Sequence, residues 1–111
     1  MATIRVPIGG HLRGFKTGAS AAQLELIANA VANVKIVVTS MVVSSIAAQQ
    51  VTFGTDENAI SGIHHTGDTE GSLVLPYNKK GWFECDAAEP LDVLLGQAVS
   101  TGFTFTYYLT T

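Results

Sequence analysis

The chain has 111 residues, of which 47% are hydrophobic and only 14% are charged. This length fits one domain that buries a core without metals or disulfides, and the composition excludes a disordered chain. Because soluble monomers normally expose more charge, the sparse charge predicts a surface partly covered by a partner. The single cysteine, Cys85, excludes an internal disulfide and a cysteine-rich zinc site, and we expect a buried thiol rather than a nucleophile.

The charges are unevenly distributed. Residues 1–24 carry Arg5, Arg13 and Lys16 with no acid, whereas the remainder has three lysines against nine acids. The first segment therefore suits an acidic protein surface. Three cations separated by glycines are too few for a nucleic-acid footprint, so no nucleic-acid partner is expected. The apolar run at residues 31–48 is interrupted by polar side chains, and no membrane span or targeting segment is predicted.

Residues 1–20 contain glycines at positions 9, 10, 14 and 18, a density that predicts neither a helix nor a long strand. The segment is nevertheless too apolar for an idle tail. It is either an irregular segment packed on its own domain or an arm that becomes ordered on a neighbouring subunit. We therefore divide the chain into an extended arm at 1–20 and a domain at 21–111.

Four stretches of the first part of the domain carry structural signals. Residues 19–33 have fair helix propensity, but the period-two spacing of Leu24, Leu26 and Ala28 favours a strand at about 23–28. The β-branched run 34–45 is the clearest strand, and its two apolar faces predict cover on both sides. A further strand is expected at 49–55 with Val51 and Phe53 inward, followed by a polar loop in which Ile60 and Ile63 anchor a short strand piece.

The second part of the domain centres on residues 71–95. Alternation at Leu73 and Leu75, a turn at 78–81 and then Trp82 predict a β-hairpin whose aromatic residues, Trp82 included, lie in the core. Another strand follows with Leu91, Val93 and Leu95 on one face.

The last stretch, residues 102–110, alternates cleanly. Its predicted inward side chains are Phe103, Phe105, Tyr107 and Leu109. Its predicted outward side chains, facing solvent or a partner, are Thr104, Thr106, Tyr108 and Thr110. Roughly seven or eight short strands at this spacing predict an all-β, antiparallel, jelly-roll-like β-sandwich with an extended N-terminal arm.

Few side chains suggest chemistry. His64 and His65 are adjacent on an extended chain and point to opposite sides, so a solvated loop is expected rather than a metal site. Glu84 and Asp86 share a predicted strand face, as glycosidase carboxylates do, but a small sandwich hardly provides a deep cleft. We predict no catalytic, metal or cofactor-binding residues, and not an enzyme.

Sugar binding is a stronger alternative, because sandwich modules stack exposed aromatic rings on sugars. The available rings are Trp82, Tyr77, Tyr107 and Tyr108, with Tyr108 the candidate for exposure. The competing interpretation, which we favour, places Trp82 in the core and Tyr108 at an interface.

The succession VANVKIVV, VTFGTDENAISG, LVLPYNKKGWFE, EPLDVLL and QAVSTGFTFTYY resembles small structural proteins encoded in tailed-phage head gene clusters. In length and layout it is most similar to the capsid decoration, or staple, proteins of short-tailed enterobacterial phages. The resemblance covers residues 28–108, and LPYN and GWF are its most specific parts. Ala88 stands where the pattern has glycine before Glu89, so the turn there is expected to differ.

The resemblance implies a non-enzymatic, jelly-roll-like protein on the outer surface of the virion, made in the host cytoplasm. It would bind the major capsid protein, bridge neighbouring subunits and stabilise the head against internal DNA pressure. We expect a homo-oligomer, with a twofold dimer favoured over a trimer. The expected capsid-binding arm comprises Ile4, Arg5, Val6, Ile8, Leu12, Arg13, Phe15 and Lys16, and a further interface comprises Thr104, Thr106, Tyr108 and Thr110. The alternative function is a carbohydrate-binding module for host-surface attachment.

Overall fold

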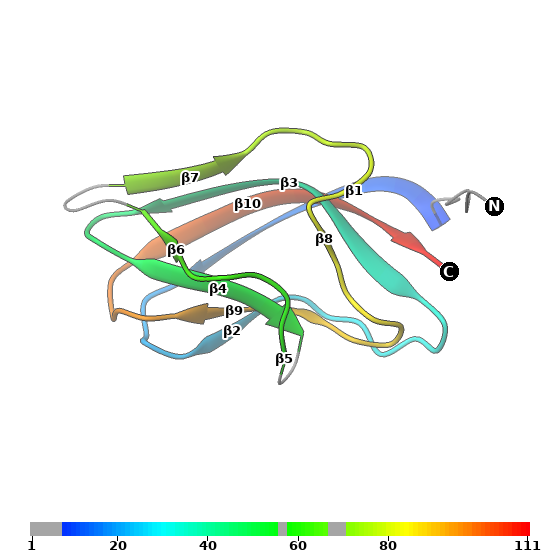
Figure 1. Cartoon of the computed structure of the whole chain (residues 1–111), viewed down its shortest axis with the longest axis horizontal. Helices are drawn as coiled ribbons and strands as arrows, with labels where there is room; N and C mark the ends of the chain where they lie inside the picture. Colours follow the sequence, from blue (N-terminus) through cyan, green and yellow to red (C-terminus); the bar gives the residue numbers. More distant parts are fainter. Residues whose placement is uncertain (1–7, 56–57, 67–70) are drawn as a thin grey trace.

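The computed structural model describes residues 8–55, 58–66 and 71–111, and every regular element among them is a β-strand. Two antiparallel sheets pack face to face, which confirms the predicted all-β sandwich (Figure 1). In the described part of the chain, no helix is long and apolar enough to cross a membrane.

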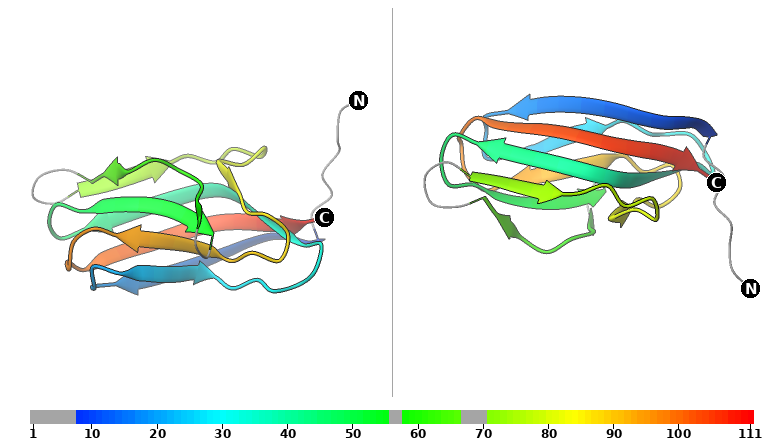
Figure 2. Two further views of the ribbon diagram at one scale, coloured as in Figure 1. Left: turned by 60° about the horizontal axis from the view of Figure 1, so that its bottom comes forward. Right: turned by 90° about the horizontal axis from the view of Figure 1, so that it is seen from above.

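Sheet A contains, in spatial order, β1 (Ile8–Gly18), β10 (Thr101–Thr110), β3 (Lys35–Ser45) and β7 (Gly71–Leu75), and β8 (Phe83–Glu84) also pairs with β3. Sheet B contains β2 (Gln23–Ile27), β9 (Leu91–Leu95), β4 (Gln50–Thr55) and β5 (Asn58–Ala59), and β6 (His64–His65) also pairs with β4. β8 lies in line with β7 along the same edge of β3, and β6 lies in line with β5 along the same edge of β4. Each sheet is therefore four strands wide. Strands that follow each other in the chain mostly lie in opposite sheets, which is the connectivity of a jelly roll (Figure 2).

The core lies between the sheets and follows the period-two patterns. The predicted inward residues Val51, Phe53, Leu91, Val93, Leu95, Phe103 and Phe105 are all buried. In β3 the inward side chains are even-numbered up to Val38 and odd-numbered from Met41 onward, because both of these residues face the core. An extra residue, Thr39, sits where Thr106 of β10 pairs with Ser40, and the Oγ1 atoms of Thr39 and Thr106 are 2.8 Å apart. This bulge lets one strand face the core along its whole length.

The structure corrects the prediction that glycines stop a long strand near the N-terminus. Residues 8–18 form an 11-residue strand, β1, which pairs with β10 at the edge of sheet A. Gly14 and Gly18 face inward, where a Cβ atom would lie 2.7 Å from the Phe105 ring and 2.9 Å from Leu24. The glycines therefore let the edge strand approach the core closely instead of ending it. Residues 1–7 lie outside the described residues, and an arm there stays a prediction.

The hairpin predicted for residues 71–83 is also wrong, whereas the strand predicted after it is β9. β7 and β8 do not pair with each other: both pair with β3, β7 at Met41–Ser45 and β8 at Val37 and Val38. They form one interrupted edge strand, and residues 76–82 between them make a loop. Trp82 and Tyr77 belong to this loop and are 42% and 60% exposed, so the expectation that they lie in the core was wrong.

Two smaller expectations change as well. Ile63 is exposed and does not anchor the short strands β5 and β6, whereas Ile60 packs against the core. β3 is covered on both faces only in its first half, because Val42 in its second half is exposed.

Candidate interaction face

The side of sheet A that points away from the core has an exposed row running across four strands. In the antiparallel register, Phe15 of β1 lies opposite Thr104 of β10, Thr104 opposite Val42 of β3, and Val42 opposite Val74 of β7. Directly opposite residues share a face. Phe15, Val42 and Val74 are 84%, 43% and 58% exposed. We call this side the outer A face.

The neighbouring row of the outer A face is made of small side chains. It consists of Thr17, Gly102, Ser44 and Ser72, one from each strand. Neither row contains a charged residue. The right-hand view of Figure 2 shows the four strands side by side, as one gently curved surface. A broad surface of methyl and hydroxyl groups without charge is cheap to desolvate, which suits it to contact with another protein.

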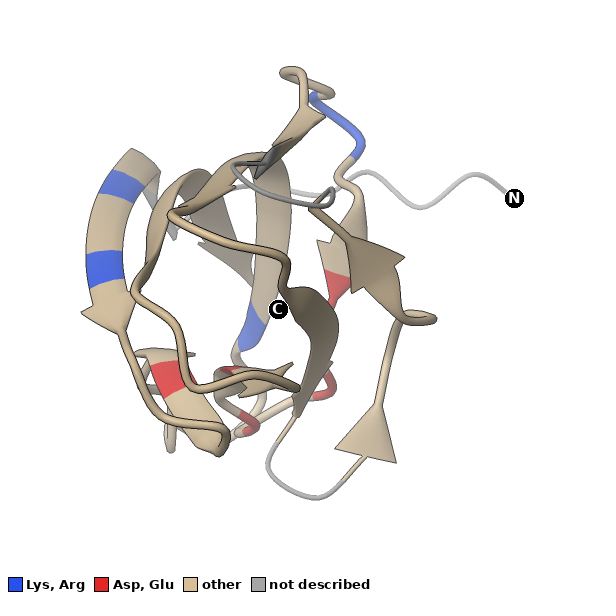
Figure 3. Ribbon diagram, turned by 90° about the vertical axis from the view of Figure 1, so that its left-hand side faces the viewer, with Lys and Arg blue, Asp and Glu red and all other residues tan. Residues whose placement is uncertain are grey.

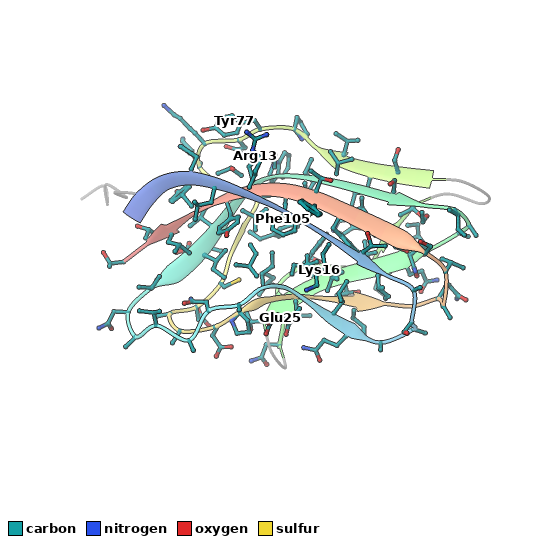
Figure 4. All side chains as sticks on the ribbon, turned by 180° about the vertical axis from the view of Figure 1, so that it is seen from behind. Arg13, Lys16, Glu25, Tyr77 and Phe105 are labelled. Atoms are coloured by element: carbon teal, nitrogen blue, oxygen red, sulfur yellow. The ribbon has the colours of Figure 1, made fainter. Side chains whose placement is uncertain are left out.

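On the other side of the exposed row lies the cation Arg13. Arg13 lies opposite Thr106, whose hydroxyl is bonded to Ser40 and Thr39 of β3. Lys16, by contrast, lies opposite Phe103 and is on the side of sheet B. Figure 4 shows Arg13 on the Tyr77 side of β1 and Lys16 on the side of Glu25.

Some residues of the predicted capsid-binding arm therefore lie on the same face as part of the predicted β10 interface. Arg13 and Phe15 from the predicted arm and Thr104 from β10 share the outer A face. Leu12 and Lys16 point to the opposite side of β1, opposite Tyr107 and Phe103. Ile8 pairs with Leu109 in the sheet, and Ile4, Arg5 and Val6 lie outside the described residues.

Tyr108 and Thr110 are not exposed, which corrects the prediction that this face of β10 is open along its length. Tyr108 is 4% exposed and Thr110 is buried. Tyr108 lies opposite Val37 of β3, and the ring of His11 meets it edge-on at 5.7 Å. The 76–82 loop lies over the same end of the sheet, since a Cβ atom at Gly81 would be 2.3 Å from Val37. The loop thus covers one end of the face and leaves the other end open.

The same loop presents the two exposed aromatic rings. The Trp82 indole Nε1–H donates to the Pro76 carbonyl at 2.7 Å, which fixes the ring across the base of the loop. Tyr77 meets the His11 ring edge-on at 6.1 Å. Lys79 and Lys80 stand between these rings in the sequence and are exposed. This arrangement is a small aromatic and basic surface beside the outer A face.

The carboxylates do not assemble as a catalytic pair. β8 ends at Glu84, so Asp86 lies beyond the strand that was expected to align them, and Glu84 is 3.7 Å from the Lys35 ammonium. Asp92 lines a hollow of about 380 Å³ on the outside of sheet B, and its Oδ2 accepts a hydrogen bond from Gln23 Nε2 at 2.5 Å. These contacts tie Glu84 and Asp92 to neighbouring strands.

Cys85 is buried, as expected. Burial raises the pKa of the thiol from 9.0 to about 12, and the negative charges of Asp92, Asp86, Glu89 and Glu84 add to the shift. A nucleophilic cysteine needs the opposite shift, because the thiolate is the reactive form.

The paired histidines point in different directions. The His64 ring lies 6.1 Å from the Phe53 ring, whereas His65 is exposed. The nearest acidic residues along the chain, Asp68 and Glu70, fall outside the described residues. Within the described ranges, no three histidine, cysteine or acidic side chains are grouped as a metal would require.

Sequence reasoning missed Val42 and Val74 as surface residues. The signal was present in β3, where Ser40, Val42 and Ser44 alternate with Met41, Val43 and Ser45. The serines of the first set mark the solvent side of the sheet. The apolar run as a whole concealed this pattern, because the bulge at Thr39 shifts the alternation halfway along the strand.

The fold and the site define a jelly-roll β-sandwich whose outer A face carries two rows of uncharged side chains across four strands. No protein-family model matches the chain, and no curated protein matches it. A similar solved structure is a chain of the extra small virus of the giant freshwater prawn Macrobrachium rosenbergii, from a cryo-EM structure of its virus-like particle. It has 9% identity and a TM-score of 0.40, over 98% of this chain and 85% of that one.

A second similar structure is a chain of infectious bursal disease virus, Gx strain, with 12% identity and a TM-score of 0.30. The match covers 90% of this chain and 32% of that one, so the present chain spans about a third of its length. Both structures come from viruses or virus-like particles.

Proposed function

We propose that the protein is a non-enzymatic decoration protein that binds the outer surface of a phage capsid through its outer A face. It would bridge neighbouring copies of the major capsid protein and stabilise the head against internal DNA pressure. On this proposal the protein acts on the virion, as a homo-oligomer, after synthesis in the host cytoplasm. The sequence resemblance to phage staple proteins provides the class of partner, and the surface chemistry of sheet A provides the site.

The observation that carries the proposal is the row Phe15, Thr104, Val42 and Val74. It brings a residue of the predicted arm and a residue of the predicted β10 interface onto one continuous face. Apolar side chains in such exposed rows gain roughly 25 cal/mol per Å² of apolar area when a partner covers them. Many copies on a lattice make a modest contact per copy effective.

Arg13 would add an electrostatic contact with the capsid. Arg13 on the outer A face lies in a strand without acids, whereas the acidic residues lie on other elements (Figure 3). Carboxylates on a capsid subunit would pair with Arg13 at the rim of the contact. Such rim pairs mainly affect association rate and salt dependence.

The test is cosedimentation with undecorated capsids of a short-tailed enterobacterial phage. Val42→Lys places a charge in the centre of the outer A face and should abolish binding. Leu94→Lys is the matched control, because Leu94 is also exposed, at 54% against 43% for Val42, but lies on the outside of sheet B. Loss of binding in Leu94→Lys with retention in Val42→Lys would contradict the proposal.

A second candidate function, sugar binding at a host surface, is favoured by the exposure of Trp82 and Tyr77. Their rings are suited to stacking on a sugar ring, and the ammonium groups of the two lysines beside them are suited to donating hydrogen bonds to its hydroxyl groups. A glycan array tests this function, since the signal should disappear in Trp82→Ala. Because Trp82 lies in the 76–82 loop, the same substitution should leave capsid binding in place.

A further inference from the structure

The outer edge of β1 is an open strand edge. Among the residues that the structure describes, β1 is the last strand of sheet A and pairs with β10 only, through a regular register from Leu12 to Gly18. The backbone N–H and C=O groups on its other side can therefore pair with another strand. Adding a strand to such an edge is a common way for two proteins to associate.

The sequence of β1 restricts which strand fits. Suppose that β1 of a second copy pairs antiparallel with β1 of the first, about a twofold axis perpendicular to the sheet. The residue on the axis then lies opposite the same residue of the second copy. An axis at Arg13 or at Lys16 would place like charges face to face, which is destabilising. An axis at Gly14 instead places Arg13 opposite Phe15 of the second copy, and Leu12 opposite its Lys16.

The Gly14 register satisfies the side chains on both faces of β1. On the outer face, each guanidinium meets an aromatic ring that is otherwise 84% exposed, and arginine over an aromatic ring is a favourable pair. On the inner face, the stem of each lysine covers Leu12 of the other copy, which is otherwise 36% exposed. At the axis the two glycines have no side chains to hold the strands apart.

We propose that two copies of the chain pair through β1, antiparallel and centred on Gly14, so that sheet A continues from one copy into the other. Because directly opposite residues share a face, the two outer A faces then form one surface of twice the width. This pairing goes beyond capsid binding and does not depend on it, so it is tested on the purified protein alone.

Cysteine cross-linking tests the register. Directly opposite residues in an antiparallel pair have Cα atoms about 4.5–5.5 Å apart, within disulfide range, whereas residues offset by two are about 7–8 Å apart. Arg13→Cys and Phe15→Cys proteins should form a disulfide-linked dimer on oxidation when mixed. Neither protein should do so alone, and the buried Cys85 should not take part. Cross-linking by either variant alone, or none in the mixture, would overturn the proposal.

Two variants with opposite charges at position 15 test the contact with Arg13, with the dimer dissociation constant measured by sedimentation velocity. Phe15→Lys sets two like charges opposite Arg13 in each dimer and should raise the dimer dissociation constant about tenfold or more. Phe15→Glu restores attraction and should leave the dimer at least as tight. Val74→Lys and Val74→Glu, on the far edge of the same face, should change nothing. A monomeric native protein, or equal weakening by both Phe15 variants, would refute the pairing.

Discussion

Ala88 is held in a backbone conformation that normally favours glycine. Its φ angle is 64°, and its N–H donates to the Val34 carbonyl at 2.9 Å, so the turn cannot relax without losing that bond. This is the position where the resembling phage proteins have glycine. An L-residue with a side chain pays about 1–2 kcal/mol for the left-handed region.

We therefore expect Ala88→Gly to raise the free energy of unfolding by about 1 kcal/mol, measured by urea denaturation. The neighbouring substitution Ala87→Gly is the control. Ala87 has no positive φ, so the greater backbone freedom of glycine in the unfolded chain should lower the free energy of unfolding of this variant slightly. Equal effects at the two positions would show that the turn is not strained.

Cys85 gives a pH dependence whose sign follows from its raised pKa. Between pH 9.0 and about 12 the folded protein keeps the thiol proton that the unfolded chain releases. Stability from this group is thus complete below pH 9 and is lost as pH rises through that range. The free energy of unfolding should fall by roughly 1.4 kcal/mol per pH unit there, relative to a Cys85→Ala variant at the same pH. Parallel pH profiles of the two proteins would contradict this assignment.

At the scale of single residues, the sequence predicted inward side chains well where strands alternate regularly. Phe103, Phe105, Val93 and Leu95 are examples. It misplaced Tyr108 and Trp82 because both depend on the 76–82 loop. A loop that folds back over a sheet buries a residue from the solvent side and exposes its own aromatics, and no period-two pattern encodes that.

Among the elements, β1 decides which truncations the fold tolerates. Its backbone bonds to β10 and its glycine contacts with Phe105 and Leu24 make it part of the sandwich. Deleting residues 2–16 should lower the unfolding temperature strongly, because it exposes the backbone of β10 and one side of the core. Deleting residues 2–7, which leaves β1 whole, should retain the folded sandwich. Thermal denaturation of both truncations checks this, and equal melting would show that β1 contributes nothing.

The strands themselves were predictable where β-branched or alternating residues are dense, as in β3, β4, β9 and β10. β1 was not, because its glycines are required by close contacts that form only in the folded state. The hairpin failed for a related reason. A turn sequence such as Asn78-Lys79-Lys80-Gly81 specifies a reversal of the chain, but both flanking strands find their partner in β3.

For the whole molecule, the two-sheet architecture was predictable from strand number and spacing, because an antiparallel set of short strands has few ways to bury its apolar faces. The interaction face was only partly predictable. Phe15 and Thr104 were expected at interfaces, but their adjacency depends on the pairing of β1 with β10, which residues 89 positions apart in the sequence cannot reveal. Val42 and Val74 join them through the same sheet.

The most direct test of the account is a cryo-EM density map of capsids decorated with the protein. The account predicts that the outer A face lies against the capsid shell, with Val42 and Val74 covered by capsid residues and with Leu94 and the outside of sheet B open to solvent. A map in which sheet B contacts the shell and the outer A face is exposed would contradict it.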